Sequence, residues 1–251
     1  MNKSEILKNV DKLVNMYKNG LLGGEVMPED SNPHLSRDAI ENYNYYTLPM
    51  ALNYQRNSYK LWESANQTWN DKETNFVFDT KLVGKATFEQ LQKALVKYRV
   101  ALQPNKQTEI WMRLSNTINE LFDGDIRKIF KINDYDVNKI RYYIQKENKN
   151  RFPYLSGNKI CNYWLYVLYQ YTNIKFRNIE ELTVAPDTHV VKASYRLGAI
   201  TEEELNSNKV QLIVIERWNE ILKETEYNPI DIHTPMWLWS RNGFKELEMI
   251  E

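Results

Sequence analysis

Residues 154–165 read Tyr-Leu-Ser-Gly-Asn-Lys-Ile-Cys-Asn-Tyr-Trp-Leu, a short polar turn that leads directly into an apolar run. Ser, Gly and Asn favour turns, so the pattern predicts a turn through Gly157 and a helix whose first turn carries Lys159. The stem of this lysine can lie against the aromatic residues that follow. An amine that is partly shielded from water loses its proton more easily and becomes a nucleophile toward an electrophilic carbon.

A second motif, Ala185-Pro186-Asp187-Thr188-His189-Val190, places a carboxylate at the expected start of a later helix. A carboxylate that accepts amide hydrogen bonds there is held rigidly and stays ionised, so it can stabilise positive charge on a substrate. Both residues have a simpler alternative: Lys159 could extend from a helix start into water, and Asp187 could act only as an N-cap. His189 is interpreted as a structural residue.

These motifs resemble those of the helix-hairpin-helix (HhH-GPD) DNA glycosylase superfamily. Its bifunctional members end their hairpin in Gly-x-Lys and carry the catalytic aspartate in a Val-Asp-x-His-like segment. Gly157-Asn158-Lys159 and Asp187-Thr188-His189 match the two motifs in the same order, whereas Tyr154 and Leu155 stand where the family has a proline and a glycine. By this resemblance Lys159 is the Schiff-base nucleophile and Asp187 assists it. The chain is most similar to the archaeal 8-oxoguanine glycosylases.

The resemblance implies an all-α fold with two lobes around a central cleft. Residues 48–185 would form a helical barrel lobe that contains the hairpin, and residues 1–47 with 186–251 would form the second lobe. The expected partner is damaged double-stranded DNA, bound by a monomer that needs no metal or organic cofactor. A flipped base, with 8-oxoguanine as the first expectation, would be excised before β-elimination cleaves the strand.

Further residues are expected to contact the DNA. Hairpin amides from Ser156, Gly157 and Asn158 lie at a helix start, where phosphates bind. Gln55, in a segment similar to the family's Leu-Ser-Ala-Gln, would fill the gap left by an extruded base, and Arg56 would bind a phosphate. The alternative for Gln55 is a polar residue on an exposed helical face.

A flipped base needs a slot lined with flat aromatic rings. Most aromatic residues at helical spacing belong to the core, so only a few can serve this purpose. The candidates are Tyr163, Trp164, Trp237 and Trp239.

The 251-residue chain is 42% hydrophobic and 26% charged, which is typical of globular proteins. Its 33 basic and 33 acidic residues give no net charge, which by itself argues against nucleic acid. Between residues 127 and 159, however, basic residues outnumber acidic ones. The basic residues of this tract are Arg127, Lys128, Lys131, Lys139, Arg141, Lys146, Lys149, Arg151 and Lys159, and the acidic ones are Asp134, Asp136 and Glu147.

The single cysteine, Cys161, excludes a disulfide within the chain and the four-cysteine iron–sulfur site of some relatives. The sequence contains no zinc-ligand spacing, Walker motif, nucleophile elbow or dinucleotide-binding loop. It also lacks an apolar stretch long enough for a membrane span, and its amino terminus is polar. The expected location is therefore cytoplasmic, and associated with the nucleoid if the source is prokaryotic.

Apolar periodicity predicts mainly helices, with a polar loop over residues 27–33 and a loop over residues 173–185. Two short apolar runs, Phe76–Phe78 and Leu212–Ile215, are the only candidate strands, and the second lies in a helical context. The expected helices cover residues 6–17, 50–69, 87–102, 106–122, 136–148, 188–197, 202–223 and 235–248, with further helix starts near residues 36 and 47.

Two alternative functions remain open. A helix-hairpin-helix module without catalysis would explain the hairpin and the basic tract. An enzyme of the same fold that acts on another N-glycoside, such as a modified nucleoside or a hypermodified base, would keep Asp187 without requiring Lys159.

Overall fold

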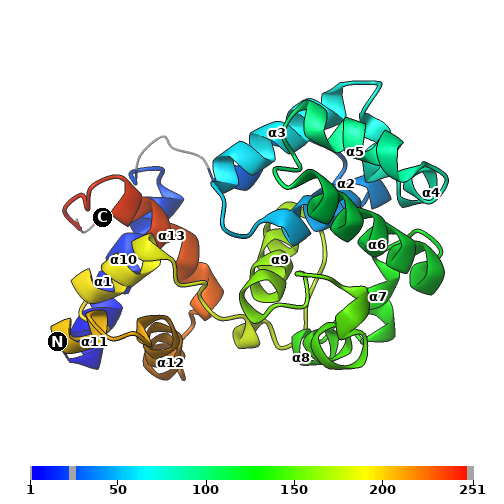
Figure 1. Cartoon of the computed structure of the whole chain (residues 1–251). Helices are drawn as coiled ribbons and strands as arrows, with labels where there is room; N and C mark the ends of the chain where they lie inside the picture. Colours follow the sequence, from blue (N-terminus) through cyan, green and yellow to red (C-terminus); the bar gives the residue numbers. More distant parts are fainter. Residues whose placement is uncertain (1, 23–26, 248–251) are drawn as a thin grey trace. The chain divides into compact units, whose positions relative to one another are not determined.

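The computed structural model describes residues 2–22 and 27–247, which contain thirteen α-helices and no β-strand. This confirms the all-α class. The described residues form two compact units: residues 2–22 with 179–247 make up the first unit, and residues 27–178 the second (Figure 1). The division differs from the expected boundaries, because residues 27–47 belong with the hairpin and residues 179–185 belong with Asp187. No helix in the described part of the chain is both long and apolar enough to cross a bilayer.

The first unit is built around α13, which packs against α1 and α10 (Figure 1). Asn2 caps α1 by accepting a hydrogen bond from the Glu5 amide at 2.9 Å. The α13 helix starts at Pro229, earlier than expected, because Asn228 and Asp231 form a capping box at this end. Residue 248, the expected end of the helix, lies outside the described residues. The helices of this unit are α1 (Lys3–Lys18), α10 (Thr188–Arg196), α11 (Glu202–Leu205), α12 (Val210–Leu222) and α13 (Pro229–Arg241), with a 3-10 turn η6 (Ile179–Glu181).

The second unit contains the longest helix, α6, and the hairpin that precedes α9. Its α-helices are α2 (Ile40–Thr47), α3 (Ser58–Asn70), α4 (Thr80–Val83), α5 (Phe88–Lys97), α6 (Pro104–Phe122), α7 (Lys128–Ile132), α8 (Val137–Tyr142) and α9 (Asn158–Tyr171). Short turns link them: η1 (Pro28–Asp30), η2 (Pro49–Leu52), η3 (Asn75–Phe78), η4 (Tyr143–Glu147) and η5 (Lys149–Arg151).

The core of the second unit is largely aromatic. Phe78 packs against Tyr45 and Trp111 with ring centroids 5.3 and 5.7 Å apart, and Phe130 lies 5.6 Å from Trp164. The Trp111 indole N–H donates to the Val77 carbonyl at 2.8 Å. Such ring contacts add about 0.5–1.5 kcal/mol each beyond the burial of apolar area.

Two expected elements of the second unit differ from the prediction. The helix expected over residues 50–69 is interrupted, since Asn57 caps a new helix by accepting from the Lys60 amide at 3.2 Å. Gln55, in the intervening turn, has a left-handed backbone with φ of 48°. The Phe76–Phe78 run forms the 3-10 turn η3 instead of a strand.

We predict that Trp164→Ala lowers the free energy of unfolding by about 3–5 kcal/mol, because a fully buried indole leaves a cavity. Tyr142, which is 59% exposed, provides the control, and Tyr142→Ala should change stability by less than about 0.5 kcal/mol. Urea unfolding followed by circular dichroism measures both values. Equal stability of the two variants would contradict the placement of Trp164 in the core.

Candidate functional site

The predicted turn before Lys159 is confirmed, and it lies between two helical segments. The segment formed by α8 and the π-helical turn η4 comes before it, and α9 begins directly after Gly157. Leu155 is fully buried and anchors the turn, while Tyr154 adopts a left-handed φ of 60°. The Gly157 amide donates to the Tyr154 carbonyl at 2.9 Å, which closes the turn.

Lys159 is the second residue of α9, and its side chain is exposed, so the expectation that its amine is partly shielded from water is wrong. Gly157 has no side chain that could cap the helix, and the first backbone hydrogen bond at this end runs from the Cys161 amide to the Gly157 carbonyl at 2.8 Å. The amides of residues 158–160 are therefore available to a ligand. Of the three amides predicted to bind phosphate, those of Ser156 and Gly157 donate to the carbonyls of Phe152 and Tyr154, both at 2.9 Å, so only the Asn158 amide remains available.

The segment that carries Gln55 lies beside the hairpin. The Tyr54 and Tyr154 rings stack with centroids 4.1 Å apart and planes inclined by 10°. Gln55 follows Tyr54 directly and is exposed. The structure thus brings together two segments that the sequence marked separately as DNA-binding.

The Arg56 guanidinium binds backbone carbonyls of its own chain and is not presented on an open surface as a phosphate ligand. Its guanidinium donates to the Val100 carbonyl at 2.7 Å and to the Arg99 carbonyl at 3.2 Å. Burial lowers the pKa of this group to about 10. These contacts favour a structural role, in which Arg56 ties the turn before α3 to the turn after α5.

The Asp187 carboxylate accepts three hydrogen bonds. Its Oδ1 atom accepts from the amides of His189 and Val190 at 2.9 and 3.0 Å, so Asp187 is the N-cap of α10. Its Oδ2 atom accepts from the Trp237 indole N–H at 2.9 Å. The carboxylate is thereby fixed in position from two helices, α10 and α13.

The surroundings of Asp187 distinguish the two predicted tryptophans of α13. Trp237 packs edge-on against the His189 ring at 5.4 Å, and the Arg241 guanidinium lies 5.1 Å from the Trp237 ring centroid. Trp239 instead packs against Phe244 and donates to the Lys245 carbonyl at 2.6 Å. Trp237 is therefore the predicted pocket residue that touches Asp187, and Trp239 stabilises the segment after α13.

The two predicted pocket residues of α9 are both engaged within the second unit. Trp164 is fully buried and donates to the Thr47 hydroxyl at 3.0 Å, which makes it a core residue and corrects its assignment to an open base pocket. The Tyr163 hydroxyl donates to Glu29 Oε2 at 3.1 Å. Glu29 is only 1% exposed, and burial raises its pKa to about 7.

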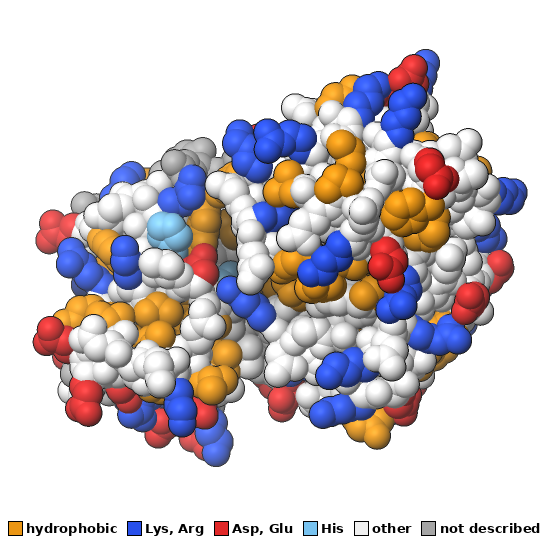
Figure 2. Space-filling model, viewed as in Figure 1, with side chains coloured by type: hydrophobic (Ala, Val, Ile, Leu, Met, Phe, Trp, Pro, Cys, Tyr) orange, Lys and Arg blue, Asp and Glu red, His pale blue; other side chains and the backbone are white. Residues whose placement is uncertain are grey.

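Three of the nine basic residues of the tract pair with acids that the sequence count omitted. Arg127 and Lys128 pair with Asp125 and Asp123, which precede the tract, and Arg151 pairs with Glu120 of α6. On the face drawn in Figure 2, Lys and Arg side chains are interspersed with Asp and Glu. Among the described residues, four lysines of the tract have no ion pair: Lys131, Lys146, Lys149 and Lys159.

Lys159 belongs to the second unit and Asp187 to the first, so the surroundings of each are known within its own unit. Neither a protein-family model nor a curated protein matches this chain significantly. The functional evidence therefore consists of the geometry of its own residues and the two motifs.

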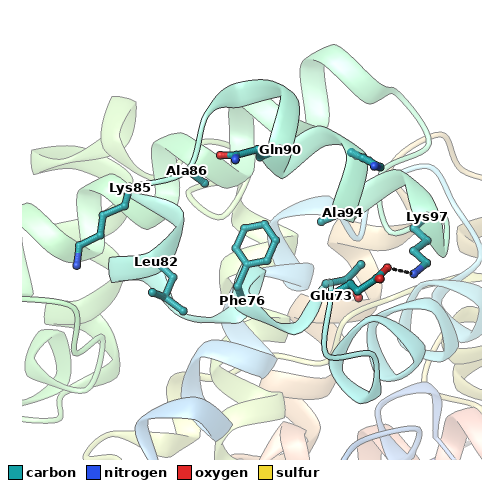
Figure 3. A pocket seen from close by; sticks show the side chains of 10 residues that line it. Glu73, Phe76, Leu82, Lys85, Ala86, Gln90, Ala94 and Lys97 are labelled. Carbon is teal, nitrogen blue, oxygen red and sulfur yellow. Dashed lines mark hydrogen bonds and ion pairs between the residues drawn. The ribbon is translucent and has the colours of Figure 1, made fainter.

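A pocket of about 520 Å³ in the second unit contains none of the predicted site residues. Its apolar lining includes Phe76, Leu82 and Ala94, and three lysines stand around it: Lys85, Lys93 and Lys97 (Figure 3). Lys97 is bound to Glu73 at 2.8 Å. Across residues 2–22 and 27–247, no group of three or more His, Cys, Asp or Glu side chains is arranged to hold a metal ion.

Sequence reasoning missed four residues that shape these surroundings: Glu29, Tyr54, Lys106 and Tyr154. Tyr154 could have been noticed in the sequence, because it departs from the hairpin motif of the superfamily that the segment resembles. The other three had none, since their contacts come from segments distant in the chain.

We predict that Asp187→Ala lowers the free energy of unfolding by about 1–2 kcal/mol, because the first turn of α10 loses its cap. Asp187→Asn keeps an oxygen acceptor for the amides of α10 and should lose less stability than Asp187→Ala. Urea unfolding compares the two variants with the wild type. A wild-type stability for Asp187→Ala would show that the carboxylate does not support the helix.

We also predict a pH-dependent gain in stability from Glu29→Gln. The pKa of Glu29 is raised from 4.5 in the unfolded chain to about 7 when folded, so the folded state binds more protons between these values. The wild type therefore loses stability as the pH rises from about 4.5 to 7, up to about 3 kcal/mol. Glu29→Gln should be more stable than the wild type at pH 8 by a margin that is lost at pH 4.

Urea unfolding at both pH values measures this difference. The exposed Glu120→Gln provides a control, and its difference from the wild type should stay within about 0.5 kcal/mol at either pH. A Glu29→Gln difference that is the same at pH 4 and pH 8 would contradict the raised pKa.

Proposed function

We propose that the protein is a DNA glycosylase with an associated lyase activity at abasic sites. The observation that carries the proposal is the placement of Lys159, exposed in the first turn of α9, directly after a closed turn and among the available amides of residues 158–160. The fixed Asp187 carboxylate supports it. In the proposed reaction, Lys159 is the nucleophile toward a sugar carbon of a flipped nucleotide, and Asp187 assists it.

Each of the two residues has a defined role in the proposed reaction. The neutral amine of Lys159 attacks C1′, and the glycosidic bond breaks with its electron pair leaving on the base, which takes up a proton. Asp187 stabilises the positive charge that develops on the sugar and accepts a proton from the substituted amine. The nitrogen lone pair then forms the C1′=N bond of a Schiff base while the C1′–O4′ ring bond breaks and O4′ takes up a proton. The Schiff base acidifies C2′, and loss of a C2′ proton forms the C1′–C2′ enamine that breaks the C3′–O bond and expels the 3′ phosphate.

The geometry of Asp187 suits this role, because its three hydrogen-bond donors prevent rotation of the carboxylate. Both Oδ atoms still have lone pairs for a substrate, since a carboxylate offers about four acceptor sites. The proposed DNA contacts are the hairpin residues Ser156 to Asn158 and the exposed Gln55. Trp237, beside Asp187, is the proposed wall of the base pocket.

We predict that borohydride traps a covalent adduct between the protein and a duplex with a damaged base or an abasic site. Lys159→Gln should abolish the adduct, while Lys93→Gln, an exposed lysine of α5, should retain it. Asp187→Asn should fold and bind DNA but release base at least about a hundredfold more slowly, because proton transfer and charge stabilisation are lost. Gel electrophoresis with and without alkali, over a panel of lesions that includes 8-oxoguanine, measures both steps.

The same assays test the alternatives. Duplex binding with no base release on any lesion would indicate a helix-hairpin-helix binding module. Base release from a nucleoside or from RNA, with none from duplex DNA, would indicate another N-glycosidase. An adduct that persists in Lys159→Gln would overturn the assignment of the nucleophile.

A further inference from the structure

Three residues from separate segments meet on the surface of the second unit. Tyr54 comes from the turn between η2 and α3, Tyr154 from the hairpin, and Lys106 from the first turn of α6. The Lys106 ammonium lies 5.6 Å from the Tyr54 ring centroid and 5.1 Å from that of Tyr154. These distances fall within the range of cation–π attraction, so one lysine contacts both rings of the stack.

The stack joins two turns whose backbones are unusual for residues other than glycine. Tyr154 has a φ of 60°, and Gln55, next to Tyr54, has a φ of 48°. Such conformations persist where surrounding contacts hold them. Because the two rings are nearly parallel and 4.1 Å apart, a shift of the hairpin would displace Gln55 as well.

Lys106 keeps its charge without a carboxylate partner. No ion pair of Lys106 occurs within the described part of the chain, whereas Lys97, another exposed lysine of this unit, is paired with Asp71 and Glu73 at 2.7 and 2.8 Å. A hydrogen bond to the Tyr154 phenol raises the pKa of Lys106 and lowers that of Tyr154. The ammonium is therefore held in one place, charged and exposed, with unused N–H donors.

We infer that Lys106 binds a backbone phosphate of the DNA strand that the hairpin holds, and that the Tyr54–Tyr154 stack fixes the spacing between this phosphate, the hairpin amides and Gln55. The inference rests on the proposed function for the identity of the ligand. It adds a positioning role for two tyrosines and a phosphate ligand on α6, a helix that neither sequence motif includes. A phosphate is the fitting anion because a compact ammonium contacts Tyr154 of the hairpin, which leads into the available backbone amides of residues 158–160.

The salt dependence of binding tests the role of Lys106. Fluorescence anisotropy of the full chain with a duplex that carries a stable abasic analogue gives the association constant between 50 and 200 mM salt. Lys106→Gln should reduce the slope of log K against log salt by about 0.9, the value for one phosphate contact, and weaken binding about tenfold at the low-salt end. Lys85→Gln, an exposed lysine of the pocket in Figure 3, should leave the slope unchanged.

The tyrosines are tested by a pair of substitutions at one position. Tyr154→Phe keeps the stacked ring and removes the hydroxyl, so binding should weaken only about twofold, whereas Tyr154→Leu removes the ring and should weaken it about tenfold. Thermal unfolding of both variants shows whether the fold is retained. Equal binding by folded Tyr154→Leu and wild type would overturn the positioning role of the stack.

Other outcomes separate this inference from the proposed function. An unchanged slope in Lys106→Gln overturns the phosphate contact, even if the wild type releases base. A reduced slope with no base release on any lesion supports the contact and overturns the proposed catalysis. Displacement of the duplex by inorganic phosphate, at an ionic strength where chloride does not displace it, would show that phosphate competes for the site. Equal displacement from the wild type and from Lys106→Gln would overturn the assignment of that site to Lys106.

Discussion

Burial of one face of α9 is the constraint on which the candidate site depends. Trp164 is inaccessible to solvent, contacts Phe130 and donates a hydrogen bond to Thr47 of α2, and Cys161, Leu165 and Leu168 are buried on the same helix. Because these side chains fix the rotation of the helix, its first turn faces outward and Lys159 is exposed. Trp164, which was predicted to line the base pocket, therefore orients the helix that carries Lys159, the proposed nucleophile.

In the first unit, hydrogen bonds hold the Asp187 carboxylate in one orientation. Two amides of α10 and the Trp237 indole supply hydrogen bonds, so Asp187 needs no basic partner at bonding distance. The two amide hydrogen bonds to Oδ1 alone would leave the carboxylate free to rotate and move Oδ2. The hydrogen bond from Trp237 of α13 removes that freedom and places an aromatic ring beside the acid, and the Arg241 guanidinium lies 5.1 Å from the centroid of this ring.

A count of charged residues along the sequence does not give the charge around the hairpin in the folded chain. Three of the nine basic residues in the tract that contains the hairpin pair with acids that precede the tract. Lys106 lies outside the tract and has no acidic partner within the described residues. Positive charge at the hairpin therefore comes from selected lysines held by local contacts, and a net charge of zero for the whole chain is compatible with an anionic partner.

The sequence by itself determined the helical class, the turn before Lys159 and the N-cap at Asp187, because caps and turns depend on residues within a few positions of one another. It also marked the hairpin and Gln55 as separate candidates. Only the tertiary structure decided that these two segments meet through Tyr54 and Tyr154, that Arg56 is occupied by carbonyls, and that Trp164 lies in the core. Those outcomes depend on which helix faces pack together, and apolar periodicity identifies a buried face without identifying its partner.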